Sequence, residues 1–193
     1  MRVVAKICGL STPETVDAAV AGGARWVGFV TYPRSPRHIS TDLLRTLGAR
    51  VPGSVGRVGL FVDPDDALLD ERLAAGTIDM LQLHGSETPA RVAELKVRTG
   101  KPVMKVIKVA TSEDAERGIA AYASVADRLM FEPAEGILPA LESAHAIAAL
   151  PEVLERLAAA GPREDGEAPV VIMGLSGRGD KDVNTLRKAF GQE

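Results

Sequence analysis

The sequence predicts an α/β protein built from repeated strand–helix units, with a parallel sheet that closes into a barrel. Short β-branched runs alternate along the chain with helical patterns that open on capping residues, which is typical of βα units. The expected strands are apolar almost throughout, which indicates burial on both faces of the sheet. A doubly wound open sheet also fits these observations. The barrel is favoured because neither a G-x-G-x-x-G fingerprint nor a Walker A loop follows the first strand.

Seven strands are expected, each from a short apolar run: residues 3–9, 26–32, 55–62, 80–85, 102–109, 128–132 and 169–177. Helices are expected at 11–20, 63–73 and 87–96, where a capping side chain precedes a proline, and at 135–158 and 181–190. A full (βα)₈ barrel takes at least about 200 residues. Nothing resembling an eighth strand follows 181–190, so a shortened or modified barrel is expected.

Composition narrows the class of protein and of partner. The 193 residues are 46% hydrophobic and 25% charged, which suits one globular domain over 1–193. A net charge of −3 gives no electrostatic reason to expect nucleic acid or a membrane as a partner. One cysteine and three scattered histidines indicate neither a disulfide framework nor a metal site. The N-terminus has no long apolar segment, so the cytoplasm is the expected compartment.

Polar or reactive side chains stand where several strands end: Cys8, Tyr32, Asp63, His84, Glu132 and Ser176. In parallel α/β folds the carboxyl ends of the strands form the functional site, so these residues should share one mouth. A lone cysteine is more often a small buried residue than a catalytic group. Without further information both interpretations of Cys8 stay open.

Four motifs in a fixed order resemble a known family. "KICG", "GFVTYPRSPR", "VGLFV" and "QLHG" look like phosphoribosylanthranilate isomerase of tryptophan biosynthesis, over about residues 4–131. That family is a (βα)₈ (TIM) barrel without metal or cofactor. It converts N-(5′-phosphoribosyl)anthranilate into 1-(2-carboxyphenylamino)-1-deoxyribulose 5-phosphate by an Amadori rearrangement, with a Cys base and an Asp acid. The resemblance implies the same activity here, at a level that the sequence leaves open.

The resemblance also implies roles for single residues. Cys8 matches the general base, a role that suits a thiol because nearby cations can tune its free pKa of about 8.5. Lys6 faces the same way along the strand and is expected in the substrate site. Glu132 stands where the family has its Asp acid, and the alternative for Glu132 is a plain surface carboxylate. Arg37 matches an arginine that binds the anthranilate carboxylate, for which a guanidinium has the right geometry.

Histidines and the last glycine-rich turn complete the expected site. His84 is expected either to contact substrate or to pack as a satisfied ring, and His38 and His145 are expected at the surface. In "LSGRG", Ser176, Gly177 and Gly179 can imitate the family's phosphate-binding turn, because backbone N–H groups in such turns bind anions.

The last third of the chain resembles a different family. "EGILPALESAHAIAAL" and "VVIMGLSGRGDKDV" look like the C-terminal end of the tryptophan synthase β chain, over about residues 133–190. In that family Glu135 would lie near the indole site and Ser176 near pyridoxal phosphate. The cofactor's Schiff-base lysine belongs to a part without counterpart here, so no cofactor is expected.

We therefore expect an isomerase-like part, 1–132, fused in frame to a tryptophan synthase β-like tail, 133–193, that replaces the last βα units of one barrel. The expected ligand is a phosphorylated small molecule, and the expected state is a monomer or homodimer. Two alternatives remain open: a noncatalytic relic or binding module, and a tryptophan synthase β-like partner of other tryptophan-pathway subunits.

Overall fold

The computed structural model describes residues 5–133 and 172–173. Within these residues the chain forms seven strands: β1 (Lys6–Cys8), β2 (Trp26–Val30), β3 (Gly56–Phe61), β4 (Met80–Leu83), β5 (Val103–Val109), β6 (Arg128–Pro133) and β7 (Ile172–Met173). Five helices lie between them: α1 (Pro13–Ala21), α2 (Thr41–Ala49), α3 (Asp66–Leu73), α4 (Pro89–Thr99) and α5 (Ser112–Tyr122). The helices expected at 135–158 and 181–190, and the candidate residues Glu135, His145, Ser176, Gly177 and Gly179, lie outside the described part.

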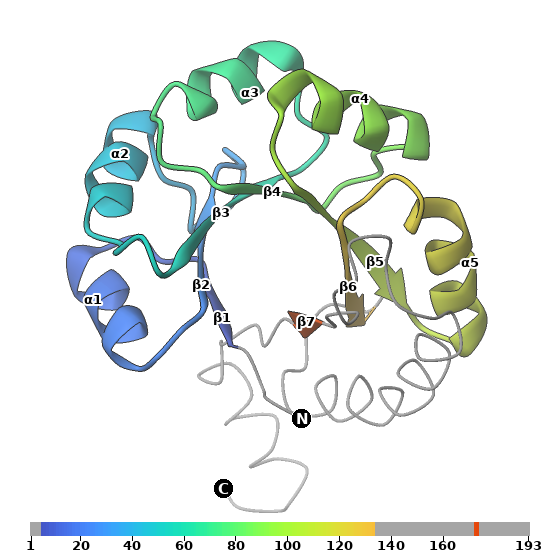
Figure 1. Ribbon diagram of the computed structural model, residues 1–193, viewed down its shortest axis with the longest axis horizontal. Coiled ribbons are helices and arrows are strands. Elements are labelled where there is room, and N and C mark those ends of the chain that lie inside the picture. Colours follow the sequence, from blue (N-terminus) through green and yellow to red (C-terminus); the bar gives the residue numbers. More distant parts are fainter. Residues whose placement is uncertain (1–4, 134–171, 174–193) are drawn as a thin grey trace, which may run out of the picture.

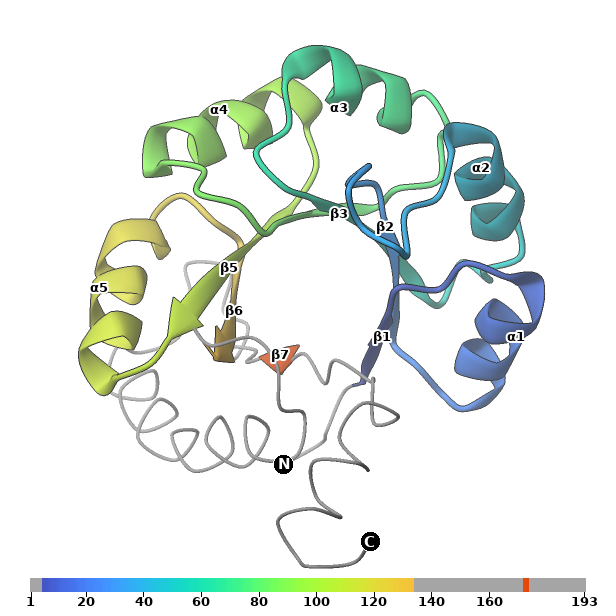
Figure 2. The ribbon, with the colours of Figure 1, turned by 180° about the vertical axis from the view of Figure 1, so that it is seen from behind.

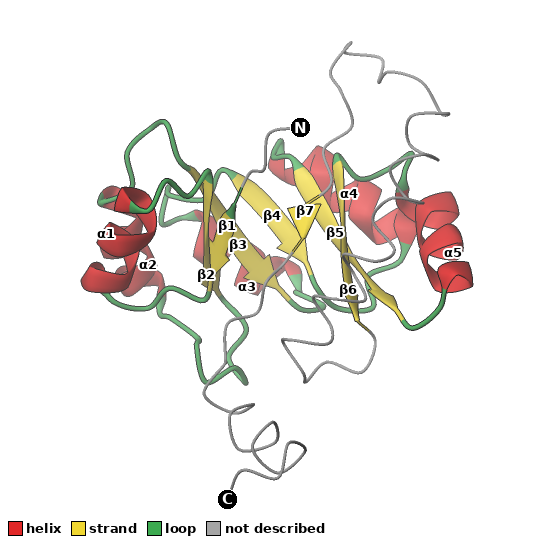
Figure 3. Cartoon of the chain, turned by 90° about the horizontal axis from the view of Figure 1, so that it is seen from below, coloured by secondary structure: helices red, strands yellow, loops and turns green. Residues whose placement is uncertain are grey.

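All strand pairs are parallel, and the sheet order β1-β2-β3-β4-β5-β6-β7 follows the chain. The sheet curves around a central axis, with helices α1 to α5 on its outer side (Figures 1 and 2). Figure 3 shows the strands running obliquely inside this ring of helices. The parallel barrel-like α/β architecture expected from the sequence is therefore confirmed over the described residues.

Two apolar clusters cover the two faces of the sheet, as the near-continuous apolar strands predicted. The outer cluster joins strand residues such as Phe29 and Leu81 to helix residues such as Leu44 and Leu95. The inner cluster lies on the barrel axis and consists of Val58, Met80, Met104, Val106 and Met130, with the partly buried Trp26 against it. Each inner residue alternates along its strand with an outer one, which is why both faces are apolar.

Trp26 closes the inner cluster at the end where β2 begins. The guanidinium groups of Arg25 and Arg128 lie over its ring, at 5.3 Å and 5.5 Å from the ring centroid. A Cβ on Gly56 would stand 2.2 Å from ring atoms of Trp26, so only glycine fits beside this ring. The bulky ring therefore packs against the inner cluster at the amino-terminal end of the strands.

Three helices were expected to begin at a capping residue that directly precedes a proline, and two of them do so. Thr12 and Thr88 cap α1 and α4, each directly before a proline. At α3 the expected cap, Asp63, is wrong, because the helix is capped by Asp65 and Pro64 precedes the cap. Asp63 instead adopts a positive φ of 43° in the turn after β3.

Within the described residues, no helix combines the length and the apolarity that a bilayer span requires.

Candidate active site

Three of the expected site residues stand at the carboxyl ends of their strands. Cys8 is the last residue of β1, His84 directly follows β4, and Glu132 lies near the end of β6. Because the strands are parallel, these ends meet at one mouth of the barrel. The mouth lies at the other end of the strands from Trp26, the first residue of β2.

Lys6 and Cys8 face the interior of the barrel together. A Cβ on Gly28 of the neighbouring strand would stand 2.7 Å from the Cys8 Sγ and 3.0 Å from the Lys6 Nζ. The absence of a side chain at Gly28 thus leaves space for both the thiol and the ammonium. The Lys6 side chain is buried, with 5% of the residue exposed, and its Nζ has no hydrogen-bond partner among residues 5–133 and 172–173.

Glu132 and His84 contact each other directly. The Nε2 of His84 lies 2.9 Å from the Oε2 of Glu132, and each side chain is 24% exposed. The other ring nitrogen, Nδ1, lies 3.3 Å from the amide nitrogen of the buried Gln82. With the amide in this orientation, Gln82 donates to Nδ1, so the neutral ring carries its proton on Nε2 and donates it to Glu132. The Glu132 carboxyl is therefore oriented from β4.

Arg37 lies beside Cys8. Its Nη1 donates to the Cys8 carbonyl oxygen at 3.5 Å, and its side chain packs against Gly9, which has a φ of 83°. A Cβ on Gly9 would stand 2.5 Å from that Nη1. The rest of the Arg37 residue is exposed, which leaves donors of the guanidinium free to meet an anion at the mouth.

His38 is not the plain surface residue that the sequence suggested. It is partly buried, and its Nε2 lies 3.2 Å from the Nη2 of the buried Arg72, whose Nη1 donates to the Thr41 hydroxyl at 2.8 Å. Burial, and then the positive charge of Arg72, lower the pKa of His38. A neutral His38 ring accepts the Arg72 hydrogen bond and so ties the segment that follows Arg37 to α3.

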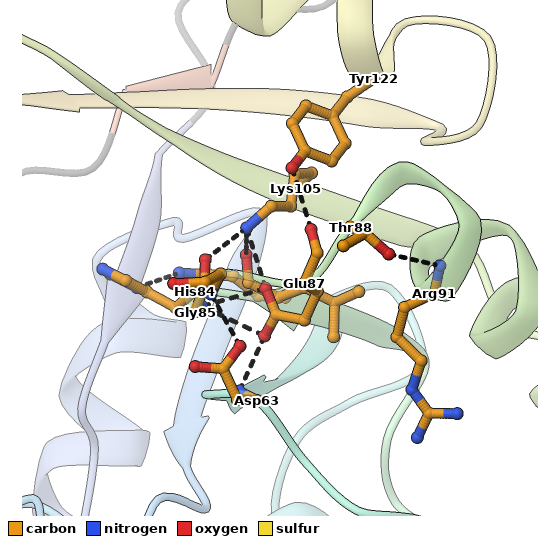
Figure 4. Close-up of polar contacts among 11 residues, drawn as sticks. Asp63, His84, Gly85, Glu87, Thr88, Arg91, Lys105 and Tyr122 are labelled. Carbon is orange, nitrogen blue, oxygen red and sulfur yellow. Dashed lines mark hydrogen bonds and ion pairs between the residues drawn. The ribbon is translucent and has the colours of Figure 1, made fainter.

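A buried ion pair behind the mouth was missed from the sequence. The Lys105 Nζ lies 2.8 Å from the Glu87 Oε2, and both side chains are almost wholly buried (Figure 4). A signal for it exists, since Lys105 interrupts the apolar run of β5 and buried lysines are rare unless paired.

Asp63 and Tyr32, both expected at the mouth, form different hydrogen bonds. The Asp63 Oδ1 accepts a hydrogen bond from the Ser86 backbone at 2.7 Å, which joins the loops after β3 and β4. Tyr32 lies partly buried just after β2, and its carbonyl oxygen accepts from the Ser35 backbone. No cluster of three or more potential metal ligands occurs among the described residues.

Comparison with known proteins gives one consistent family. The model of the N-(5′-phosphoribosyl)anthranilate (PRA) isomerase family matches residues 5–137. An N-(5′-phosphoribosyl)anthranilate isomerase of Paracoccus denitrificans is 51% identical over 142 residues, which are 72% of this chain and 66% of that protein. One of Rhodospirillum centenum is 50% identical over 132 residues, 68% of this chain and 61% of that protein. The chain thus spans somewhat less than two thirds of the length of these relatives.

Solved structures show the same fold. The phosphoribosyl anthranilate isomerase of Thermotoga maritima has a TM-score of 0.62 and 30% identity, and the match covers 68% of this chain and 62% of that one. The enzyme of Thermus thermophilus has a TM-score of 0.67 and 26% identity over 96% of this chain and 84% of that one.

Proposed function

Because the chain belongs to the N-(5′-phosphoribosyl)anthranilate isomerase family, we propose that it catalyses the isomerase step of tryptophan biosynthesis. The substrate is N-(5′-phosphoribosyl)anthranilate, and the product is 1-(2-carboxyphenylamino)-1-deoxyribulose 5-phosphate. The observation that carries the proposal is the pairing of Glu132 with His84 at the mouth that also holds Cys8. A proton donor and a proton acceptor at one strand-end site are what an Amadori rearrangement requires.

The reaction needs two proton transfers. Glu132, protonated, gives its proton to the furanose ring oxygen while the bond from that oxygen to C1 breaks, which leaves an iminium ion. The Cys8 thiolate then takes the proton from C2, and the electrons of that C–H bond neutralise the iminium to give an enolamine. Tautomerisation of the enolamine yields the ketone, and exchange with water returns a proton to Glu132 and removes one from Cys8, so both groups regain their starting forms.

Three further side chains have supporting roles in this proposal. The ammonium of Lys6 is available to substrate, because it has no hydrogen-bond partner among the described residues. Arg37 binds the anthranilate carboxylate from beside Cys8. His84 holds the Glu132 carboxyl in place.

For the part outside the described residues we keep the sequence-based proposal. Residues 133–193 are a tail of tryptophan synthase β-like sequence, supported by the motifs "EGILPALESAHAIAAL" and "VVIMGLSGRGDKDV". Ser176, Gly177 and Gly179 bind the substrate phosphate in place of the family's own phosphate turn. The tail is also the segment through which other tryptophan-pathway subunits would bind. A pulldown with tryptophan synthase subunits, with residues 133–193 deleted as the control, tests that contact.

The loss of substrate fluorescence on adding purified protein to freshly made N-(5′-phosphoribosyl)anthranilate tests the activity. Turnover by the wild type that Cys8→Ser abolishes supports the proposal, because a serine hydroxyl is far less acidic than a thiol. Turnover that survives Cys8→Ser contradicts the mechanism. No turnover, together with no growth of an isomerase-deficient tryptophan auxotroph carrying the gene, would favour the relic or binding module instead.

A further inference from the structure

The buried pair of Glu87 and Lys105 is arranged around His84 (Figure 4). The Lys105 Nζ donates to the Gly85 carbonyl oxygen at 2.7 Å and lies 3.5 Å from the Leu83 carbonyl oxygen. These two carbonyl groups belong to the residues on either side of His84. The ammonium therefore fixes the backbone that carries the imidazole.

Glu87 closes the same turn from the other side. Both of its carboxylate oxygens lie 3.1 Å from the Gly85 backbone nitrogen, and one accepts from the Asp63 backbone nitrogen at 2.9 Å. The His84 backbone N–H itself donates to the Phe61 carbonyl oxygen at 2.8 Å. The pair thus ties the loop after β4 to the end of β3 and to β5.

Helix α5 shields the pair. The Tyr122 hydroxyl donates to the Glu87 carbonyl oxygen at 2.9 Å, and the Lys105 Nζ lies 5.5 Å from the centre of the Tyr122 ring. Burial, and then the charge of Glu87, raise the pKa of Tyr122, so the hydroxyl stays a donor at neutral pH. Apart from their contact with each other and the bond from the Asp63 backbone, the two side chains form hydrogen bonds with the backbone on either side of His84.

Stability alone is a weak reason for such a pair. A buried ion pair often contributes no more than a well-packed apolar pair of the same volume, because both charges lose their water. What an apolar pair cannot do is hold three backbone groups on both sides of one residue. We therefore relate the free-energy cost of burying these two charges to a requirement for a fixed position of His84.

We propose that Lys105 and Glu87 are positioning residues for proton transfer at Glu132 and act through His84. The pair fixes the turn, the turn fixes the imidazole between Gln82 and Glu132, and the imidazole orients the carboxyl at the mouth. This inference rests on the proposed function, in which Glu132 is the acid. Neither residue contacts the reacting atoms.

The double substitution Lys105→Met with Glu87→Gln tests it, because it removes both charges without leaving either one buried alone. We expect kcat to fall about 10- to 100-fold with KM within about twofold, since a misplacement of about 1 Å can cost about 10²-fold. The ring ¹H–¹⁵N signals of His84 should shift as well. They are easily assigned, because the chain has only three histidines.

The ion pair of Arg57 and Asp79 supplies the matched control. It also joins neighbouring strands, with an N···O distance of 2.7 Å, but at the amino-terminal ends of β3 and β4, away from the mouth. Arg57→Met with Asp79→Asn should lower the stability of the protein and leave kcat and the His84 signals unchanged. If both double variants lower kcat equally, or if Lys105→Met with Glu87→Gln leaves kcat and the His84 signals as in the wild type, the inference is wrong.

The His84 ring signals distinguish a failure of the proposed isomerase function from a failure of the inference that Lys105 and Glu87 position His84. If the wild type shows no turnover, the proposed function fails, and a shift of the His84 signals in the double variant still supports the positioning of the ring. If the double variant does not fold, Glu87→Gln alone keeps one oxygen to accept from Gly85 and Asp63 and replaces the oxygen that faces Lys105 by an amide NH2. A shift of the His84 signals and a loss of kcat are then expected, both smaller than those expected for the double variant. Their absence overturns the inference.

Discussion

The Glu132 carboxyl contacts His84 at the mouth of the barrel. Substitutions at Glu132 can therefore test its acidic proton and its side-chain length separately. Glu132→Gln keeps the length of the side chain and removes the proton, and we expect kcat to fall about 10²- to 10⁴-fold. Glu132→Asp keeps the proton and shortens the stem by one methylene, which takes the carboxyl away from the 2.9 Å contact with His84. Steady-state rates for both variants check this. A Gln variant as fast as the wild type would exclude Glu132 as the acid.

Gly28 leaves space for the side chains of both Lys6 and Cys8, and its substitution should disable the site. In Gly28→Ala the new methyl would stand 2.7 Å from the Cys8 Sγ, so the thiol has to move. We expect kcat to fall about 10²-fold, and the rate of Cys8 alkylation by iodoacetamide to change. Gly53→Ala is the control, because nothing lies within 4 Å of its Cβ. Equal rates in both variants would contradict the placement of the thiol.

At the scale of single elements, α3 gives a direct test of its corrected start. The Asp65 side chain accepts from the Leu68 backbone nitrogen at 2.8 Å, so Asp65→Ala should cost about 1 kcal/mol of unfolding free energy, as is usual for a lost helix cap. Urea denaturation followed by circular dichroism measures this. Thr88→Ala, at the cap of α4, serves as a positive control of the same kind. An unfolding free energy of Asp65→Ala equal to that of the wild type would indicate that Asp63, and not Asp65, caps α3.

The strands were predictable because each is a local apolar run, and β1 to β6 all fall within or next to their expected ranges. The α3 cap was not predictable. Asp63 and Asp65 are equally good caps by local rules, but in the folded chain the Asp63 carboxylate accepts from the Ser86 backbone, 23 residues away. Local sequence carries no sign of that contact.

The site was predictable where a motif marks it and not where it depends on contacts between strands. Cys8, His84 and Glu132 end their strands, so topology alone brings them to one mouth. The contact of His84 with Glu132 depends on the curvature of the sheet, which brings β4 and β6 together across β5. Lys105 shows in the sequence as a charge within an apolar strand, but its partner lies 18 residues away in a loop.

For the whole molecule, His38 makes stability depend on pH near neutrality. Its pKa is lowered in the folded state by burial and by Arg72, so the unfolded chain binds the proton more tightly. The stabilisation from a neutral His38 is fully present above the pKa that histidine has in the unfolded chain, about 6.5. It is lost as the pH falls through the lower pKa of His38 in the folded state. His38→Gln keeps an acceptor for Arg72 without titrating.

Urea denaturation between pH 5 and 7.5 tests this. We expect the difference in unfolding free energy between wild type and His38→Gln to narrow or reverse as the pH falls. Carboxylates with a lowered pKa, such as Asp79, where the hydrogen bond from Arg57 lowers the pKa, do not interfere, because the shift moves their titration further from this pH range. A difference that stays constant across this range would show that His38 is not held neutral by the fold.

The strand order has a consequence for how the protein is made. Among the strands that the structure describes, each pairs with its neighbours along the chain, so a strand that leaves the ribosome meets an edge that has already been synthesised. A nascent chain that has released β1 to β5 already contains Cys8, His84, and the Glu87 and Lys105 that surround the His84 turn. Glu132, on β6, follows them along the chain. In the proposed mechanism the base is therefore synthesised before the acid, and proton transfer requires that β6 has joined the sheet.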